Sequence, residues 1–341
     1  MNNLLKIKIM NRKIIFHTTG NSEVLKLSKE EIPVPGKKEV VVAVKAVGLN
    51  RADNLFHHGF YIVAPHFPSS LGIEGAGIVH ATGKDVSDFK KGDRVSILPS
   101  FDLSKYGVLG DFALIPAGSL MKLPDDFSMV SGASMWVSYF TAYVGLVQKG
   151  DLKQRESPFV VISAASSSVG LAAIQVAKRY KATVIATTRA SSKKAFLLKN
   201  GADHVIATGE ENFVDEIMNI TDNKGFDIAL DAIAGPFVNQ LAMAAAPEAS
   251  IIIYGALSME ETPYPLFFAT AKGINISSLH VDVNLLKHPA RMEEAKRDII
   301  SGFNGGFYNL IIDKTFSFEN FKNAFEYLEK ADLQGKIVIE N

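Results

Sequence analysis

The chain has 341 residues, with 36 Lys plus Arg balanced by 36 Asp plus Glu, 47% hydrophobic residues and no cysteine. The missing thiols exclude disulfides, thiolate zinc sites, iron–sulfur clusters and a cysteine nucleophile. The balanced charge gives no basic footprint for nucleic acid or for an anionic membrane, and the length allows roughly two domains.

The N-terminal segment mixes basic side chains with short apolar runs over residues 1–13. It lacks the apolar core of roughly 7 to 15 residues that a signal peptide requires. No uncharged apolar stretch of about 18 residues occurs elsewhere, so the sequence predicts no transmembrane helix. We therefore expect a cytoplasmic protein, with Met1 or Met10 as its first residue.

The first third of the chain is rich in β-forming residues and is interrupted by Gly and Pro. The predicted short strands cover residues 40–47, 75–80, 94–98 and 111–115. Short strands between turns are typical of a small β-barrel.

From about residue 130 the pattern changes to short apolar strands that alternate with longer helices, which indicates parallel βαβ units. The predicted strands are 159–163, 183–187, 204–206, 227–231 and 250–254, and the predicted helices are 169–180, 191–200, 213–220 and 238–245. This alternation predicts an α/β fold with a doubly wound sheet of five strands.

The C-terminal segment does not continue this alternation. It contains predicted helices at 291–300 and 318–330 and a final strand at 335–340. We expect it to return to the first domain, so that one domain comprises residues 1–132 and 276–341 and the other comprises residues 133–275.

The turn after the first parallel strand is where an open α/β sheet binds a dinucleotide, at a helix N-terminus. Here it reads Ala164-Ala165-Ser166-Ser167-Ser168-Val169-Gly170, so Ala165 and Ser167 replace two glycines of the G-x-G-x-x-G pattern and Gly170 retains the third. Small side chains still permit close approach, and three hydroxyls can donate to phosphate oxygens. The alternative is an ordinary small-residue turn that leads into a helix.

The end of the second parallel strand carries Thr188 and Arg189, followed by Lys193 and Lys194, with no carboxylate before Asp203. An NAD site places Asp or Glu near this position to bind the ribose 2′-hydroxyl. Hydroxyls and cations suit a 2′-phosphate instead, so NADP is favoured. The alternative is a solvated cationic start of a helix.

Seven segments together resemble the medium-chain dehydrogenase/reductase superfamily, and within it the zinc-independent quinone reductases and 2-enoyl thioester reductases. The segments are Val47-Gly48-Leu49-Asn50-Arg51-Ala52-Asp53, residues 72–79, residues 89–95, Thr141-Ala142-Tyr143, residues 167–170, residues 200–202 and Gly335-Lys336-Ile337-Val338. The resemblance extends over nearly the whole chain. It implies a GroES-like β-barrel catalytic domain and a doubly wound Rossmann cofactor domain.

The resemblance also argues against a catalytic metal. Zinc-using relatives carry histidine at the position of Ile73, and Glu74 alone cannot hold a metal. Neighbouring histidines at 57 and 58, and His66 beyond them, lack an evident carboxylate partner, and adjacent histidines are expected to point in different directions. We expect no metal site, and we expect the histidine pair to form an exposed helix end or a pocket wall.

The implied reaction is hydride transfer from NADPH to a quinone or to an activated C=C bond of an enone, a 2-alkenal or a 2-enoyl thioester. Such a reaction forms an enolate-like anion that modest hydrogen bonding stabilises. Gly59-Phe60-Tyr61 resembles the segment that carries a catalytic tyrosine in enoyl thioester reductases, so Tyr61 is the candidate proton donor. The alternative is that Tyr61 only lines the pocket. Asn50 is expected near the nicotinamide, where it orients the substrate or the cofactor.

Other cofactor contacts are carried over from the same resemblance. They are Ser138 and Thr141 at the nicotinamide, Tyr254 and Gly255 along it, Lys193 at the 2′-phosphate, and Lys336 at a cofactor phosphate across a cleft between the domains. Ordinary structural roles remain open for three of them: a helix N-terminal residue for Thr141, a core aromatic for Tyr254 and a solvated cation for Lys336. Thr208 departs from the family, in which a tyrosine commonly faces the adenine ribose phosphate.

Two further expectations concern partners and activity. The β-rich segment at residues 273–281 could pair with its own copy across a two-fold axis, which predicts a homodimer. The rival to the enzyme hypothesis is a nucleotide-binding or structural protein of the same fold with little turnover.

Overall fold

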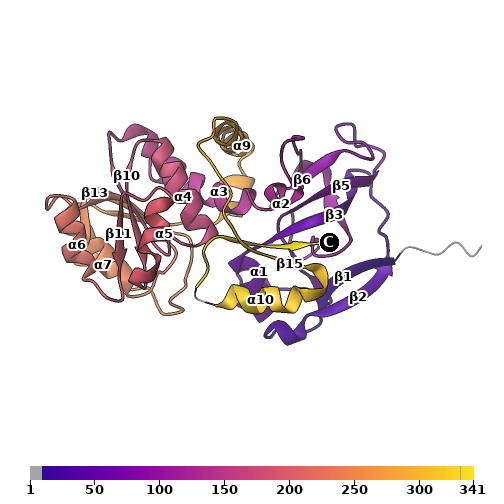
Figure 1. Ribbon diagram of the computed structural model, residues 1–341, viewed down its shortest axis with the longest axis horizontal. Coiled ribbons are helices and arrows are strands. Elements are labelled where there is room, and N and C mark those ends of the chain that lie inside the picture. The colour runs from indigo at the N-terminus through magenta and orange to yellow at the C-terminus, as the bar shows by residue number, and fades with distance from the viewer. Residues whose placement is uncertain (1–9, 331) are drawn as a thin grey trace, which may run out of the picture. The chain divides into compact units, whose positions relative to one another are not determined.

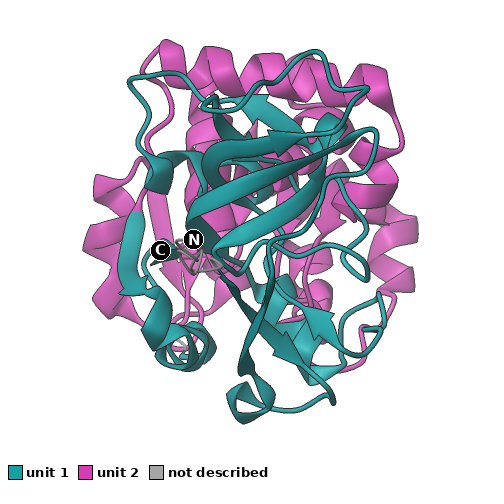
Figure 2. Cartoon of the chain, turned by 90° about the vertical axis from the view of Figure 1, so that its right-hand side faces the viewer, with its two compact units in different colours: residues 1–137, 312–341 teal, residues 138–311 magenta. Residues whose placement is uncertain are grey.

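The computed structural model describes residues 10–330 and 332–341. The chain forms two compact units, one of residues 1–137 and 312–341 (unit 1) and one of residues 138–311 (unit 2), coloured separately in Figure 2. The N-terminal segment on which the expectation of a cytoplasmic protein rests lies largely outside the described residues. Across the described ranges, no helix combines the length and the apolar character needed to cross a membrane.

Unit 1 is built on two β-sheets. The larger sheet has the strand order β15-β16-β3-β5-β6-β8, with β7 also paired to β3, and the smaller has the order β2-β1-β4. The strands are β1 (Met10–Phe16), β2 (Lys26–Glu31), β3 (Glu39–Leu49), β4 (Ser69–Ser70), β5 (Gly75–Thr82), β6 (Arg94–Ile97), β7 (Phe112–Pro116), β8 (Leu120–Lys122), β15 (Ile312–Ser317) and β16 (Lys336–Glu340).

The long strand β3 organises unit 1 because its valines are buried and it pairs with β5, β7 and β16. Strand β16 runs antiparallel to β3, with Ile337 opposite Leu49, so the end of the chain lies in unit 1. The helices that begin in this unit are α1 (Arg51–His58), α2 (Met129–Gly132), α3 (Trp136–Tyr143) and α10 (Phe321–Glu329), with short 3-10 turns η1 (Ser22–Val24), η2 (Ala117–Ser119) and η7 (Phe318–Asn320).

Unit 2 contains a parallel sheet with the order β11-β10-β9-β12-β13-β14. The strands are β9 (Phe159–Ile162), β10 (Thr183–Thr188), β11 (His204–Ala207), β12 (Phe226–Asp231), β13 (Ala245–Ile253) and β14 (Asn275–Ser278). Helices α4 and α5 lie on one side of the sheet and α6 and α7 on the other (Figure 1). The central strand β9 is fully buried at Val160, Val161 and Ile162, as a strand covered on both faces must be.

The remaining elements of unit 2 are η3 (Val144–Lys149), η4 (Leu152–Gln154), α4 (Ser168–Arg179), η5 (Ser191–Lys193), α5 (Lys194–Lys199), α6 (Phe213–Ile220), α7 (Phe237–Ala244), α8 (Leu266–Lys272), η6 (Asp282–Leu286) and α9 (Pro289–Asn304). The five predicted parallel strands are all present, and the sheet gains a sixth, β14.

The unit boundaries differ from those expected from the sequence. Residues 276–311 lie in unit 2, because β14 continues the parallel register of β13, with Ile251 opposite Ile276. Residues 133–137 lie in unit 1, so the division falls within α3. The sequence suggested otherwise because the segment after residue 280 breaks the βαβ alternation.

Candidate functional site

The candidate phosphate turn lies at the carboxyl end of β9, where α4 begins. Ser167 is the N-cap of α4, and its hydroxyl accepts a hydrogen bond from the backbone N–H of Gly170 at 3.1 Å. Ala164 has a φ of 46°, a left-handed conformation that glycine adopts without strain. The turn therefore has the shape of a glycine-rich loop although its glycines are replaced by small residues.

Gly170 is the position in this turn where a side chain is sterically impossible. A Cβ atom built there would lie 2.5 Å from the carbonyl oxygen of Ala165 and 2.6 Å from its Cα atom. These are backbone atoms, which cannot rotate away. Gly170 thus performs the packing role of the third glycine in a dinucleotide-binding turn.

Lys193 lies beside this turn. It is the last residue of η5 and only 7% exposed, and its Nζ atom donates a hydrogen bond to the Ser166 hydroxyl at 3.1 Å. A buried ammonium beside a helix N-terminus makes the electrostatic potential of the turn positive. Lys194 differs, since its ammonium pairs with Glu211 at 2.6 Å.

The end of β10 supplies the other residues that the sequence predicted for the ribose phosphate. Thr188 is the buried last residue of β10, and Arg189 follows it with an exposed side chain. The carbonyl of Thr188 accepts from the hydroxyl of Thr208 at 3.2 Å. Thr208, which replaces the family's tyrosine, is thus engaged with the backbone of the neighbouring strand.

Tyr254 and Gly255 follow β13 at the same edge of the sheet. The backbone N–H of Tyr254 donates to the Asp231 carbonyl at 2.8 Å. Burial raises the pKa of Tyr254, so its phenol stays protonated. A Cβ atom at Gly255 would lie 2.8 Å from the Ala232 carbonyl oxygen, so this backbone also packs closely.

Sequence reasoning missed a pair that fixes the neighbouring loop. The Ser163 hydroxyl donates to Asp231 Oδ1 at 2.5 Å, and the other carboxylate oxygen accepts from the backbone N–H of Ala234 at 2.8 Å. Burial raises the pKa of Asp231. The one signal in the sequence is a polar residue at the end of each of two apolar strands, β9 and β12.

Ser138 and Thr141 lie three residues apart on α3 and hence on one face of that helix. Both are buried, at 2% and 6% exposure. Within the described ranges, the Ser138 hydroxyl has no hydrogen-bond partner, and the same holds for the Thr187 hydroxyl at the end of β10. A buried hydroxyl without a partner costs free energy unless a ligand satisfies it.

These features of unit 2 fit an anionic dinucleotide. The small-residue turn permits close approach of a pyrophosphate, and the N-terminus of α4 and Lys193 supply positive charge. The sequence has no carboxylate from residue 188 to residue 194, although Glu210 Oε1 accepts from the backbone N–H of Ser191 at 3.0 Å. These residues are compatible with a dinucleotide that carries a 2′-phosphate, such as NADP(H).

In unit 1, Lys336 is buried and does not reach solvent as an isolated cation. Its ammonium, with a side chain only 2% exposed, forms an ion pair with Glu74 and donates to the Asn50 side-chain oxygen at 2.6 Å. The alternative of a solvated cation is therefore wrong, and the contact of Lys336 with a cofactor phosphate stays a prediction. The lysine follows Gly335 at the chain end, which suggested a solvated position, but β16 carries it into the interior.

Asn50 and Glu74 connect this ion pair to two helices. Asn50 is the N-cap of α1, and its amide donates to Glu74 Oε1 at 3.0 Å. The other oxygen of Glu74 accepts from the backbone N–H groups of Trp136 and Val137, at the start of α3, at 3.1 and 3.0 Å. Glu74 therefore caps α3 and neutralises Lys336 at once.

Asp53 completes this buried polar group. Its carboxylate accepts from the backbone N–H groups of Asn50 at 2.9 Å and Gly72 at 3.1 Å. Burial nevertheless raises the pKa of Asp53 to about 7, because it disfavours the ionised form. The predicted site residue Asn50 is thus held by three ionisable neighbours, Asp53, Glu74 and Lys336.

Tyr61 follows the left-handed C-cap of α1 at Gly59. Its backbone N–H donates to the Leu55 carbonyl at 3.1 Å, and its half-buried ring packs edge-on against Phe56 with centroids 6.4 Å apart. The backbone and the ring are therefore both anchored to α1.

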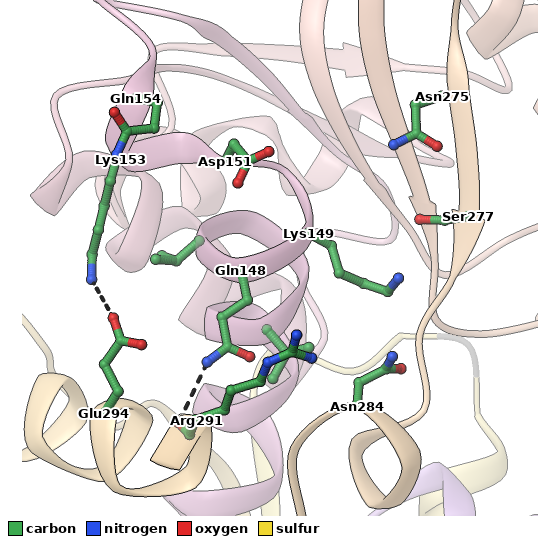
Figure 3. Close-up of a pocket in the computed structure, with 12 residues that line it drawn as sticks. Gln148, Lys149, Asp151, Lys153, Gln154, Asn275, Ser277, Asn284, Arg291 and Glu294 are labelled. Atoms are coloured by element: carbon green, nitrogen blue, oxygen red, sulfur yellow. Dashed lines mark hydrogen bonds and ion pairs between the residues drawn. The ribbon is translucent and has the colours of Figure 1, made fainter. Parts of the chain in front are cut away.

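Unit 2 also has a polar hollow of about 530 Å³ lined by η3, η4, β14 and α9 (Figure 3). Lys153 and Glu294 form an ion pair at 3.0 Å on one side of it, and Lys149 and Asn284 lie on the other. None of the predicted catalytic or cofactor-binding residues lines this hollow, although Asn275 and Ser277 of the predicted dimer strand do. It is therefore separate from the candidate phosphate turn.

Comparison with known proteins agrees with this geometry. Residues 36–125 match the family described as alcohol dehydrogenase GroES-like domain, and residues 168–287 match the family described as zinc-binding dehydrogenase. The quinone oxidoreductase of Pongo abelii is 33% identical over 234 residues, which cover 68% of this chain and 69% of that protein. The synaptic vesicle membrane protein VAT-1 homolog of Rattus norvegicus is 28% identical over 328 residues, covering 90% of this chain and 78% of that protein.

Among solved structures, Escherichia coli quinone oxidoreductase complexed with NADPH matches with a TM-score of 0.88 and 26% identity. The match covers 97% of this chain and 100% of that chain. The fold is thus a GroES-like unit joined to a Rossmann-like unit. The chain belongs to the medium-chain dehydrogenase/reductase superfamily of oxidoreductases, among relatives named quinone oxidoreductase.

Proposed function

We propose that the chain is an NADPH-dependent oxidoreductase that transfers hydride to a quinone or to an activated C=C bond. The observation that carries the proposal is the buried ammonium of Lys193, which donates to Ser166 in the turn that begins α4. It is supported by the similarity to a quinone oxidoreductase whose structure was solved with NADPH. When bound, NADPH supplies the hydride, and the residues of the chain bind it, orient the substrate and provide the proton.

We propose a preference for NADPH over NADH because positively charged side chains lie near the end of β10. Lys193 attracts a 2′-phosphate, Arg189 lies nearby in the chain, and the Thr188 hydroxyl accompanies them at the end of β10. An NAD-preferring site would instead need a carboxylate to accept from the ribose hydroxyls. We infer that Ser166 to Gly170 hold the pyrophosphate and that Ser138, Thr141 and Tyr254 face the nicotinamide end.

We further propose that catalysis uses no zinc. Glu74 is already bound by Lys336, Asn50 and two backbone N–H groups of α3. A cation at this carboxylate would have to displace a buried ammonium, which would then lack a partner of opposite charge. Ile73, where zinc-using relatives carry histidine, offers no ligand atom.

Without a Lewis acid, a proton donor must complete the reduction of an enone or enoyl thioester. Hydride addition to the β-carbon leaves an enolate, and protonation at the α-carbon or the oxygen restores a neutral product. We propose Tyr61 as this donor, because its ring and backbone are held against α1. Asn50 is proposed to position the reacting groups.

A fluorescence titration with NADPH and NADH tests the cofactor assignment. We expect saturable binding with NADPH tighter than NADH by roughly tenfold or more, since a buried phosphate–ammonium contact is charge-assisted. Lys193→Gln should remove most of this preference, while Lys194→Gln, whose ammonium faces Glu211, should keep it. The enzyme hypothesis fails if neither dinucleotide binds below millimolar concentration, and a preference for NADH would overturn the role of Lys193.

A second candidate function is nucleotide binding or a structural role with little turnover. The observation behind it is that a relative similar over 90% of this chain is named a synaptic vesicle membrane protein and carries no enzyme activity in its name. A panel of 1,4-benzoquinones, 2-alkenals and 2-enoyl-CoA, each with NADPH, separates the two candidates. Saturable NADPH binding without NADPH oxidation by any of the three classes would support the second.

The proposed assembly is a homodimer. Strand β14 stands at one end of the sheet of unit 2, and its segment, residues 273–281, alternates polar and apolar residues. Pairing of β14 with the same strand of a second copy would extend the sheet across a two-fold axis. Sedimentation at the mass of a monomer would refute this assembly.

A further inference from the structure

The ends of helices α1 and α10 bring three metal-ligating side chains together in unit 1. His57 and His58 are the last two residues of α1, and Glu329 is the last residue of α10, a helix that packs beside α1 (Figure 1). One potential ligand atom from each of the three residues lies within 4.8 Å of the others. None of these residues belongs to the proposed hydride-transfer site.

The hydrogen bond that His57 makes with its Nδ1 atom leaves its other ring nitrogen available. Its Nδ1 atom lies 2.8 Å from the Gly20 carbonyl oxygen. A carbonyl only accepts hydrogen bonds, so Nδ1 carries the proton, and Nε2 of the neutral ring presents a lone pair. The residue is 0% exposed, and within the described ranges Nε2 has no hydrogen-bond partner.

This arrangement of His57 is the one that metal-binding histidines adopt. A ligating imidazole usually donates its other N–H to a carbonyl or carboxylate, which fixes the tautomer and the ring orientation. The ring also packs edge-on against Phe325 of α10, with centroids 5.2 Å apart. Burial lowers the pKa of His57 to about 4, so it stays in the neutral form that binds metal.

His58 and Glu329 complete the cluster at its solvent side. Nε2 of His58 lies 2.9 Å from Oε1 of Glu329, and Asn54, one turn earlier on α1, donates to the same oxygen at 2.9 Å. The two side chains are 24% and 40% exposed, so an ion can reach them from solvent. A ligand for the fourth position would therefore be water.

These contacts correct the expectation from the sequence. Adjacent histidines were expected to point in different directions, but the two rings lie side by side, with centroids 4.6 Å apart and planes tilted by 35°. The carboxylate partner was not evident because it lies 271 residues further along the chain. The pair is neither a free helix end nor a simple pocket wall.

We propose that His57, His58 and Glu329 form a binding site for a divalent transition metal, with Zn²⁺ as the ion that the ligands suit best. Two imidazoles and one carboxylate, with water in the fourth position, are a common tetrahedral set for zinc. Imidazole ligands disfavour Mg²⁺ and Ca²⁺, which prefer oxygen. On binding, the ion would replace the hydrogen bond between Nε2 of His58 and Glu329, and Nε2 would have to give up its proton to present a lone pair.

The bound ion would connect two segments that are distant in sequence. It would clamp the end of α1 to the end of α10, and through the Gly20 carbonyl it would also hold the loop after β1. Because the site needs both helices in place, the ion binds the folded chain in preference to the unfolded chain. Metal binding should therefore stabilise the fold by mass action.

The test is a zinc titration of the full chain after treatment with a chelator, followed by calorimetry. We expect one Zn²⁺ per chain, with submillimolar affinity and a rise in melting temperature. Glu329→Gln and His58→Gln should each weaken binding by roughly tenfold or more, because each removes one ligand. His204→Gln, at an exposed histidine in β11 of unit 2, should leave binding unchanged.

Absorption of bound Co²⁺ provides a second readout, since tetrahedral and octahedral Co²⁺ differ in their visible bands. Melting temperatures measured in chelator show whether the variants fold, which separates loss of a ligand from loss of structure. The proposal is overturned if the wild-type chain shows no saturable binding. It is equally overturned if correctly folded Glu329→Gln and His58→Gln chains bind Zn²⁺ as tightly as the wild type.

Discussion

The ammonium of Lys336 and the carboxylate of Glu74 form an ion pair in the interior of unit 1, with side-chain exposures of 2% and 0%. Asn50 binds both partners, and Glu74 also accepts from two N–H groups of α3. The pair joins β16, the last strand of the chain, to residues near its beginning. Removing either partner would destabilise the fold, because the remaining charge would be buried without a partner of opposite sign.

Replacing the lysine tests this relationship. Lys336→Met leaves the Glu74 charge buried without its cation, and we expect the free energy of unfolding to fall by about 3 to 5 kcal/mol. Urea denaturation measures the change. In Lys336→Met/Glu74→Gln the lone charge is gone, so part of the loss should be recovered.

The matched control is Lys322→Met. Lys322 pairs with Glu23 at 2.8 Å on the surface, where an ion pair contributes less than about 1 kcal/mol. Equal losses of stability in the two lysine variants would show that breaking the interior pair costs no more than breaking a surface pair.

The close packing of Gly170 against Ala165 predicts that adding a methyl group at residue 170 destabilises the turn. Gly170→Ala places Cβ 2.5 Å from the Ala165 carbonyl oxygen, so the turn must move. We expect a loss of about 1 to 3 kcal/mol in stability and a weaker affinity for NADPH. Urea denaturation and a dinucleotide titration measure both effects.

Gly118→Ala is the control for that methyl group, since a Cβ atom there would meet nothing within 4 Å. It should change neither the stability of the chain nor its NADPH affinity appreciably. Unchanged NADPH binding by Gly170→Ala would remove this turn from the cofactor site.

The proton-donor proposal predicts a difference between substrate classes. Tyr61→Phe removes only the hydroxyl, and we expect kcat for enone or enoyl thioester reduction to fall by about 100-fold or more. Quinone reduction should change less, because a quinone is protonated on oxygen, which exchanges protons directly with water. Steady-state rates with NADPH measure both.

Tyr264→Phe is the matched control, because Tyr264 is a 63% exposed tyrosine of unit 2. It should leave both activities unchanged. Equal rates for Tyr61→Phe and the wild type on all substrates would show that Tyr61 only lines the pocket.

The buried, neutral His57 predicts how stability depends on pH. Its pKa is about 4 in the folded chain, because burial disfavours the charged form, against about 6.5 in the unfolded chain. Between these values the unfolded chain binds more protons, so the stability contributed by neutral His57 is lost as the pH falls. The expected loss is about 2 kcal/mol between about pH 7.5 and about pH 5.

Asp53 acts in the opposite sense over part of the same range, because its pKa is raised to about 7 and folding favours its protonation as the pH falls. The measurement must therefore compare the wild type with His57→Gln, in chelator, by urea denaturation at several pH values. The stability difference between the two chains should shrink toward acid pH. A difference that stays constant with pH would contradict a neutral buried His57.

The sequence predicted the parts of the site that depend on local pattern. The parallel strands, Gly170 and Lys193 follow from hydrophobic periodicity and from the position of the turn between β9 and α4. Contacts between distant segments were not predictable in this way. Lys336 finds Glu74 across 262 residues, and Ser163 finds Asp231 across 68, and no periodicity marks either pairing.

The left-handed backbone of Ala164, with φ of 46°, restricts the conformations of the turn that leads into α4. A left-handed backbone conformation is unfavourable for alanine by about 1 kcal/mol. Alanine also has fewer accessible backbone conformations than glycine, so the turn samples fewer of them. The backbone of this turn is therefore more restricted in the folded chain than that of a glycine-rich loop. At the proposed pyrophosphate site, less backbone freedom would therefore be lost on binding than in a glycine-rich loop.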